Sequence, residues 1–155
     1  MKKIVYLVAI MIACITITGC GKSDTKKMEC TMVNEGNNMN AYGDMTYYFK
    51  DDKLTSAEFK VSFKDITIAN LDSVWAQFVE QFDSQNPKVD EVGYKINTSS
   101  DDTKHEYYIT MKIDFEKISK ETIEKYGIDD AKGKSMEEIK KDLMEENPDS
   151  KVTCK

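Results

Sequence analysis

The feature that most constrains the fold is a strict alternation of apolar and polar residues in two separate segments. In "LTSAEFKVSF" (54–63) one face carries Ala57, Phe59, Val61 and Phe63. In "KHEYYITMKIDF" (104–115) one face carries His105, Tyr107, Ile109, Met111, Ile113 and Phe115. Side chains of a strand point alternately to its two faces, so this pattern predicts strands with one buried face and one face in water. Antiparallel hairpins produce such half-buried strands.

Shorter segments of strand character surround these two. They are "MECTMV" (28–33), "AYGDMTYYFK" (41–50), "EVGYKINTS" (91–99) and "SKVTCK" (150–155). The stretches between them, "NEGNNMN", "DDK" and "SSDDTK", are rich in the residues that favour turns. We therefore expect several antiparallel strands in one sheet, in an order that the pattern does not fix.

The period changes to that of a helix between residues 70 and 85. An apolar stripe at helical spacing is formed by Leu71, Val74, Trp75, Phe78, Val79 and Phe82. Asn70 is a plausible N-cap and Asn86-Pro87 a stop signal. A stripe of this kind belongs to a core more often than to a ligand slot, so the helix must lie on the sheet.

Two smaller helices are predicted near the C-terminus. One runs from Ser119 to Tyr126 and ends at Gly127, and the other, "SMEEIKKDLMEE", opens with a capping box of Ser135 and Glu138. The expected fold is α+β: a two-layer sandwich in which an antiparallel sheet carries the main helix, at about 70–85, and the small C-terminal helices on one face.

The N-terminus has the pattern of an export signal. Lys2 and Lys3 precede an apolar run, 4–17, that is shorter than the roughly 20 residues of a spanning helix. The run ends in Ile17-Thr18-Gly19-Cys20, which resembles the lipobox of bacterial lipoproteins. The resemblance implies cleavage before Cys20 and acylation of its thiol, and two acyl chains are enough for stable membrane anchoring. An ordinary signal peptide and an uncleaved anchor are the alternatives.

The chain is therefore expected to have three parts: a signal peptide (1–19), a lipidated N-terminus with a flexible spacer (20–27), and a single globular domain (28–155). Without residues 1–19 the chain has 20 lysines against 28 carboxylates, a formal net charge of −8, and no arginine. Such a surface repels polyphosphates, so nucleic acid is not an expected partner. The expected location is the extracytoplasmic side of the cell membrane.

The cysteines suggest a disulfide. Cys14 leaves with the signal and Cys20 carries lipid, so Cys30 and Cys154 remain, an even number in an oxidising compartment. They are expected to join the first strand to the last. Two free buried thiols are the alternative, and the spacing gives little support to a redox-active pair.

Candidate catalytic and metal-binding residues are few. His105 is the single histidine, and it stands close to Asp101-Asp102, so a general base or a metal ligand is conceivable. The pairs Asp51-Asp52, Asp101-Asp102 and Asp129-Asp130 fall at predicted turns, where aspartate is favoured by hydrogen bonds to its own backbone. The sequence lacks a nucleophile elbow, a phosphate-binding loop and a dinucleotide fingerprint. We expect no catalytic residues, no metal and no cofactor.

Tyrosines are the more suggestive residues. Those on predicted strands are Tyr42, Tyr47, Tyr48, Tyr94, Tyr107 and Tyr108. Of these, Tyr48 and Tyr108 are expected on faces opposite the core, where exposed rings can stack on a ligand or a partner. Scattered cross-strand pairs are the alternative.

Two further segments carry a family resemblance. Together with the lipobox and the small strand-rich body, "MKIDFEKI" (111–118) and "YGIDDAKGKSMEEIKKDL" (126–143) resemble the YehR-like family of bacterial lipoproteins. The resemblance implies a two-layer α+β fold and a tethered extracytoplasmic location, and it supplies no catalytic residues.

These observations favour a non-enzymatic, lipid-anchored lipoprotein that binds an unknown protein or small molecule through its exposed sheet face or through the edge of its helical layer. One alternative is an envelope hydrolase that uses His105 with an acidic neighbour. Another is a purely structural envelope component without a ligand.

Overall fold

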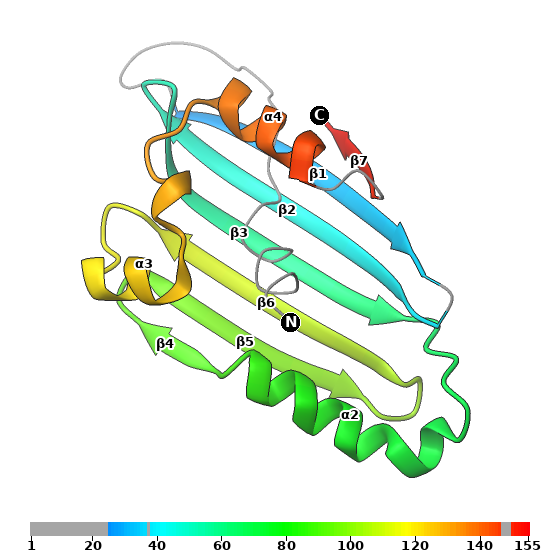
Figure 1. The fold of residues 1–155 in the computed structure, drawn as a ribbon. Helices are drawn as coiled ribbons and strands as arrows, with labels where there is room; N and C mark the ends of the chain where they lie inside the picture. The colour runs from blue at the N-terminus through cyan, green and yellow to red at the C-terminus, as the bar shows by residue number, and fades with distance from the viewer. Residues whose placement is uncertain (1–24, 37, 147–149) are drawn as a thin grey trace.

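The computed structural model describes residues 25–36, 38–146 and 150–155, so Cys20 and the expected signal sequence lie outside it. The strands are β1 (Thr25–Glu35), β2 (Asn40–Lys50), β3 (Lys53–Lys64), β4 (Val89–Glu91), β5 (Tyr94–Asp101), β6 (Glu106–Asp114) and β7 (Lys151–Cys154). The helices are α2 (Leu71–Gln85), α3 (Lys120–Tyr126), the 3₁₀ turn η1 (Asp129–Ala131) and α4 (Met136–Glu146). Figure 1 shows their arrangement. Among these described residues, no helix is long and apolar enough to cross a bilayer.

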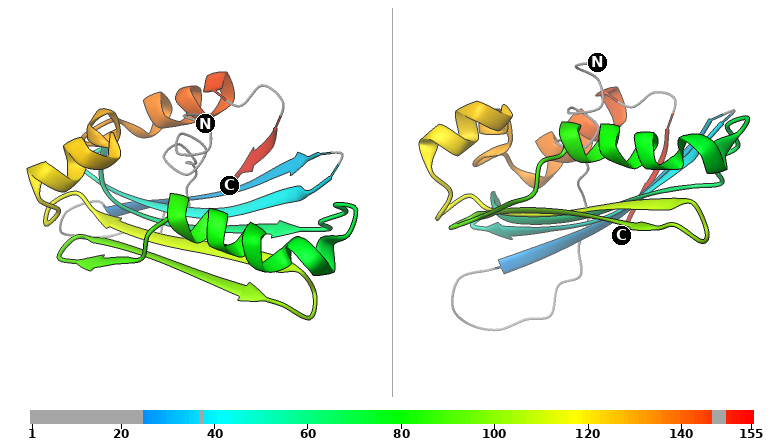
Figure 2. Two further views of the ribbon diagram at one scale, coloured as in Figure 1. Left: turned by 60° about the horizontal axis from the view of Figure 1, so that its bottom comes forward. Right: turned by 90° about the horizontal axis from the view of Figure 1, so that it is seen from below.

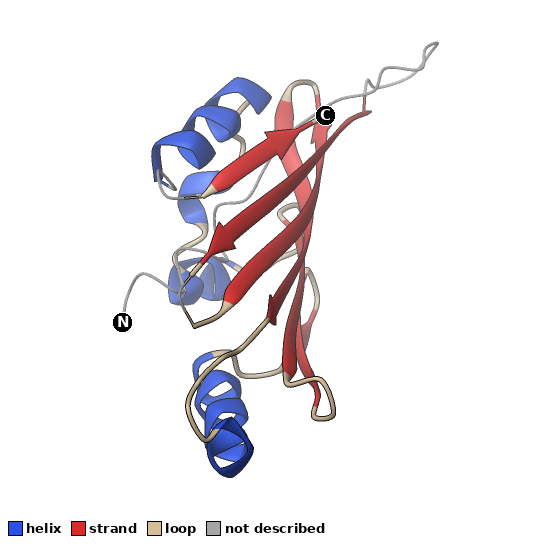
Figure 3. Cartoon of the chain, turned by 90° about the vertical axis from the view of Figure 1, so that its right-hand side faces the viewer, coloured by secondary structure: helices blue, strands red, loops and turns tan. Residues whose placement is uncertain are grey.

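The strands form one seven-stranded sheet in the order β4-β5-β6-β3-β2-β1-β7. Every neighbouring pair is antiparallel. The described helices lie on one side of the sheet, and in the side view of Figure 3 the other side carries none of them. Figure 2 shows α2 over the β5 and β6 half and α4 over the half that contains β1 and β2. The expected α+β organisation, with an antiparallel sheet, is therefore present.

The alternating segments behave as their period predicts. On β3 the side chains of Ala57, Phe59, Val61 and Phe63 are buried, and on β6 those of Tyr107, Ile109, Met111 and Ile113 are buried. Their neighbours in sequence face the other side of the sheet. We call the side without described helices the open face.

Aromatic side chains attach α2 to the sheet. Trp75 and Phe82 of the predicted stripe are buried, and Phe78 is partly buried against the core. The Phe82 ring lies 5.1 Å from the ring of Phe63 and 5.2 Å from that of Tyr107, measured between centroids. Edge and tilted contacts of this kind add to the free energy gained by burial, so α2 is fixed over the β3 and β6 ends.

The predicted helix termini near the C-terminus are confirmed. The Ser119 hydroxyl accepts a hydrogen bond from the Thr122 backbone, and Gly127 ends α3 in the left-handed region at φ 62°. At α4, the Glu138 carboxylate accepts from the backbone N–H and the hydroxyl of Ser135. These hydrogen bonds satisfy groups that a helix end would otherwise leave unpaired.

The expected disulfide is present. Cys30 and Cys154 are directly opposite one another on β1 and β7, with a Cα–Cα distance of 4.2 Å. It fixes the short edge strand β7, which has only four residues, to the long strand beside it.

Two predicted boundaries are wrong. The spacer was expected to reach residue 27, but β1 begins at Thr25, because residues 25–27 pair with Tyr48, Phe49 and Lys50 on β2. Backbone pairing does not need the apolar period that those residues lack. The segment 91–99 is not one strand either: Gly93, at φ 83°, makes the turn between β4 and β5.

The predicted N-cap position of α2 is confirmed, whereas the predicted place of His105 is wrong. Asn70 is the N-cap residue of α2, but its side chain makes no capping bond; its backbone lies in the left-handed region, and its carbonyl accepts from the Ser73 hydroxyl. His105 was expected near the start of a strand, on the same face as Tyr107 and Ile109. It instead lies in the β5–β6 turn at φ 51°, a conformation that histidine tolerates better than most residues.

Candidate functional site

The open face is polar along the centre of the sheet. Side chains that alternate with the core residues reach it from β1, β2, β3, β5 and β6. The pairing of neighbouring strands places these side chains in rows that run across the sheet. One row consists of Thr31, Asp44, Lys60, Thr110 and Asn97. The chemistry of this face is therefore that of hydroxyl, amide and charged groups, with aromatic rings at a few positions.

One row carries two tyrosines with a serine between them. Tyr42 on β2 is opposite Ser62 on β3, and Ser62 is opposite Tyr108 on β6. We call these three residues the tyrosine row. Ser62 is only 9% exposed although it belongs to the open face, whereas both tyrosines are half-buried. Directly opposite side chains on neighbouring strands lie about 5 Å apart, so both tyrosines are close neighbours of Ser62.

Carboxylates hold both rings of the tyrosine row. The Tyr42 hydroxyl donates to Asp65 Oδ2 at 3.4 Å, and Asp65 also accepts from Asn40 Nδ2 at 3.0 Å. The Tyr108 hydroxyl donates to the carboxylate of Glu106, and this hydrogen bond raises the pKa of Tyr108 above its usual value. Rings held in this way lose little conformational freedom when a ligand binds.

The predicted pair of Tyr48 and Tyr108 is not brought together. Tyr48 does face away from the core, but it is opposite Ser56, whereas Tyr108 is opposite Ser62. Those partners are six residues apart along β3, which is about 20 Å at the rise of a strand. Tyr42, which has the same alternation as Tyr48, is the tyrosine that shares a row with Tyr108.

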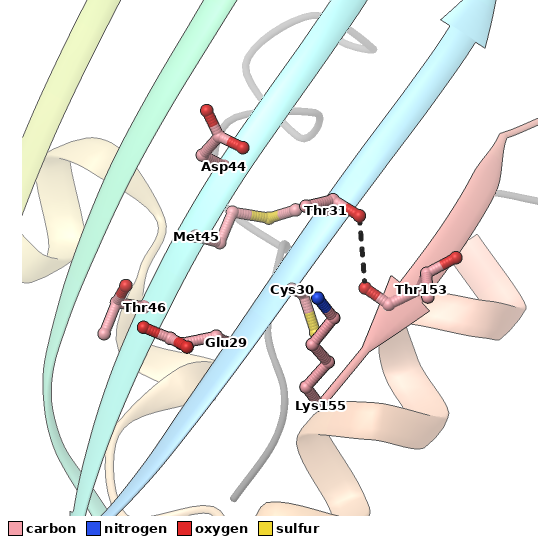
Figure 4. A pocket seen from close by; sticks show the side chains of 8 residues that line it. All are labelled: Glu29, Cys30, Thr31, Asp44, Met45, Thr46, Thr153 and Lys155. Atoms are coloured by element: carbon pink, nitrogen blue, oxygen red, sulfur yellow. Dashed lines mark hydrogen bonds between the residues drawn. The ribbon is translucent and has the colours of Figure 1, made fainter.

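A hollow of about 250 Å³ lies beside the tyrosine row, at the β1 and β7 edge of the sheet. We call it the edge hollow, and Figure 4 shows the side chains that line it. They are Glu29, Cys30, Thr31, Asp44, Met45, Thr46, Thr153 and Lys155. The Thr31 hydroxyl points to the Thr153 carbonyl, at 3.4 Å. The disulfide between Cys30 and Cys154 fixes β7 here and thereby shapes one wall of the hollow.

The edge hollow and the tyrosine row are close to one another along β1 and β2. Thr31 is opposite Asp44, and two residues further along the same strands Val33 is opposite Tyr42. Two residues of a strand span about 7 Å, so a ligand of moderate size in the hollow would reach the Tyr42 ring. Both parts lie on the open face, the hollow at the β1 and β7 edge and the row across β2, β3 and β6.

His105 belongs to a different part of the molecule. Its Nε2 lies 3.1 Å from Asp72 Oδ1 of α2, and its ring is tilted against Trp75 with centroids 5.1 Å apart. The Trp75 indole donates to Asp102 Oδ1 at 2.8 Å, and the Ser100 hydroxyl donates to the same oxygen at 2.8 Å. The hydrogen bond from Trp75 is the main cause that lowers the pKa of Asp102. These contacts connect the β5–β6 turn to the first half of α2.

The acidic neighbour of His105 is thus Asp72, and not the adjacent pair that the sequence suggested. Asp101 instead stabilises the β5–β6 turn: its carboxylate accepts hydrogen bonds from the backbone N–H and the hydroxyl of Thr103 and from Lys104. The Lys104 ammonium is the main cause that lowers the pKa of Asp101 to about 2. In the described part of the chain, no group of three or more metal-ligating side chains gathers at one point.

Another polar cluster holds the C-terminal end of α2 to the sheet. Asp83 Oδ1 accepts from the hydroxyls of Thr98 and Tyr107, at 2.5 and 2.6 Å. The bond from Thr98 is the larger cause that lowers the pKa of Asp83, while burial raises the pKa of Tyr107 and keeps its proton in place. The arrangement fixes the helix to β5 and β6.

Comparisons with known proteins add little. No family model matches the chain, and no curated protein matches it. Among solved structures, an NMR structure of a protein from Streptococcus pneumoniae TIGR4 is similar to 92% of this chain and 94% of its own, with 11% identity and a TM-score of 0.44. At that level the likeness carries no argument about function.

Proposed function

We propose that the protein is a non-enzymatic, lipid-anchored lipoprotein on the extracytoplasmic side of the membrane that binds a ligand or partner on its open face. The lipobox at Cys20, the apolar run before it and the acidic body without arginine support the location. The resemblance to YehR-like lipoproteins points to the same place. The disulfide between Cys30 and Cys154 is compatible with an oxidising exterior.

The tyrosine row is the single observation that carries the binding role. A sheet with a purely structural role needs only a polar open face. Here two tyrosines stand on either side of a buried serine, and the hydroxyl of each tyrosine donates to a carboxylate. Aromatic side chains that are fixed in advance and remain partly open are typical of binding surfaces.

The hydrolase alternative receives less support. A hydrolase that uses His105 needs a nucleophile or water-activating contact at the ring. The ring nitrogen Nε2 lies beside Asp72, and the Ser100 hydroxyl in the same hairpin donates to Asp102. These contacts hold a turn against a helix, which is a structural role.

The anchoring part of the proposal is tested by Cys20→Ser. The full chain should move from the membrane fraction to the soluble fraction, because the acyl chains can no longer be attached. Retention of the variant in membranes that are washed with high salt would refute lipid anchoring.

The binding part is tested with envelope material purified from the cell that makes the protein. The full chain in mild detergent should sediment with this material, and Tyr42→Ala or Tyr108→Ala should reduce the bound fraction. Tyr48→Ala is the matched control, since it removes a tyrosine from the same face but outside the row. Equal binding of all four proteins would reject the tyrosine row. No binding by any of them would favour a structural component without a ligand.

A screen of ester, glycoside and peptide substrates distinguishes the hydrolase. Turnover that is present in the wild type and lost in His105→Ala would contradict a non-enzymatic role.

A further inference from the structure

We propose that the ligand is a neutral carbohydrate chain, with sugar rings against the tyrosine row and sugar hydroxyls in the edge hollow. This inference rests on the proposed function, because it names the ligand of the same open face. Three features support it: the spacing of the rings, the hydrogen-bonding groups of the hollow and the charge of the domain.

The tyrosine row offers two rings separated by one small side chain. Tyr42 and Tyr108 stand on strands two positions apart, which is about 10 Å at the spacing of neighbouring strands. Sugar rings present C–H groups that pack against the face of an aromatic ring. A flat, extended chain can therefore cross the strands over Ser62 and contact both rings.

The edge hollow offers donors and acceptors in the mixture that hydroxyl groups require. The hydroxyls of Thr31, Thr46 and Thr153 both donate and accept, the carboxylates of Glu29 and Asp44 accept, and the Lys155 amine donates. A sugar hydroxyl also donates and accepts, so each can find a partner there. Figure 4 shows these side chains arranged around the hollow.

Charge argues against acidic ligands. The chain carries 28 carboxylates against 22 lysines, so it repels polyanions. It has no arginine, and so it lacks the guanidinium group that can donate two parallel hydrogen bonds to phosphate or sulfate. Two of the carboxylates line the hollow itself. A neutral ligand avoids this repulsion and can still use the carboxylates as acceptors.

The open face also disfavours an apolar protein partner. Among the described residues, the large apolar side chains that are exposed are Ile68, Val92 and Met144. They lie before α2, in the β4–β5 turn and on α4, and none belongs to the tyrosine row or the edge hollow. The core of a protein interface is usually rich in apolar as well as aromatic side chains, and this surface offers its tyrosines without an exposed large apolar neighbour among the described residues.

The test uses the full chain in mild detergent, titrated by calorimetry with a panel of neutral oligosaccharides: β-1,4-linked hexamers of N-acetylglucosamine and glucose, and hexamers of mannose and galactose. At least one should bind. Tyr42→Ala should weaken its affinity about tenfold through the lost ring contact, and Asp44→Asn should weaken it about tenfold through the lost charged acceptor. Tyr48→Ala should leave it unchanged. Asp44→Asn keeps the size of an exposed side chain, so the test does not depend on a variant that could fail to fold.

Binding to envelope material distinguishes a wrong ligand class from a wrong binding role. If the envelope material binds through the tyrosine row but no oligosaccharide binds, the carbohydrate is wrong and the binding role stands. Envelope material treated with protease should still bind; loss of binding after that treatment would identify a protein ligand and overturn the inference. A heparin hexamer that binds more tightly than every neutral hexamer would also overturn it.

Discussion

Removal of the disulfide should have a large effect that can be calculated from the fold. Cys30 and Cys154 are 124 residues apart, so the bond closes almost the whole described domain into a loop. In the chain-entropy model a loop of that length removes about 16 cal/mol/K from the unfolded state, which is about 5 kcal/mol at 25 °C. Measured losses for native disulfides are about 2–5 kcal/mol, and we expect the free energy of unfolding to fall within this range.

The assay is guanidinium unfolding of the full chain in detergent, followed by the fluorescence of Trp75, the single tryptophan. The oxidised protein is compared with the same protein in reductant and with the double variant Cys30→Ala/Cys154→Ala. The reduced protein contains no substitution, so it controls for the small cavity that alanine leaves at the buried Cys30. Reduction should also increase the m-value, because the unfolded chain without a cross-link exposes more surface.

Thermal unfolding gives an independent measure. With an unfolding entropy of about 2.1 cal/mol/K per residue over the domain, a loss of about 3 kcal/mol lowers Tm by roughly 10 °C. A loss below about 1 kcal/mol by both methods, together with an unchanged m-value, would refute the reasoning that the bond acts by restricting the unfolded chain.

Three further changes test the packing and the electrostatics. Gly93→Ala would place its Cβ 2.2 Å from the backbone nitrogen of Ile118, so we expect chemical unfolding to show a loss of about 3 kcal/mol or more in the free energy of unfolding. In the control Gly133→Ala the new Cβ meets nothing within 4 Å, so this variant should lose only about 1 kcal/mol, because of its positive φ. Leu143→Ala should cost about 2–5 kcal/mol, because this side chain of α4 is fully buried, and a loss below 1 kcal/mol would show that α4 is not packed as described. Two hydroxyl donors lower the pKa of Asp83 in the folded protein. Its stabilising contribution is therefore present above its unfolded pKa of about 4 and is lost as the pH falls through the lower folded value. Asp83→Asn should flatten the dependence of stability on pH in that acid range, and an unchanged acid slope would contradict this assignment.

Local patterns were enough to predict the elements. The alternation around Phe59 and Ile109 gave the strands, the stripe with Trp75 gave α2, and the capping box at Ser135 gave the start of α4. Each of these signals lies within a few residues of sequence and reflects burial or hydrogen bonding over that distance. Long-range order was not predictable: β3 pairs with β6 across an intervening helix and two strands.

The tyrosine row was missed because one extra residue changes the register. The β2–β3 turn pairs Lys50 with Lys53, and an unbroken ladder from there would set Tyr42 opposite Val61, a core residue. A bulge between Tyr48 and Phe49 leaves Thr55 as the extra residue and moves every later pair by one. Tyr42 then faces Ser62. Without the position of that bulge, the sequence could place tyrosines on the correct face but not in the correct rows.

The short link between the lipid and the sheet leads to a prediction about orientation. Four residues lie between Cys20 and Thr25, where β1 begins, so the Cα atoms of Cys20 and Thr25 are at most about 18 Å apart. The tyrosine row lies at the level of Val33, eight residues along β1, which adds about 27 Å. The proposed anchor would therefore hold the Asp52 turn near the bilayer and the row away from it. A fluorescent non-natural residue at Asp52 should be quenched strongly by nitroxide-labelled lipid headgroups, and the same residue at Ser99 weakly. Equal quenching at both positions would contradict this orientation, and stronger quenching at Ser99 would place the binding surface against the membrane.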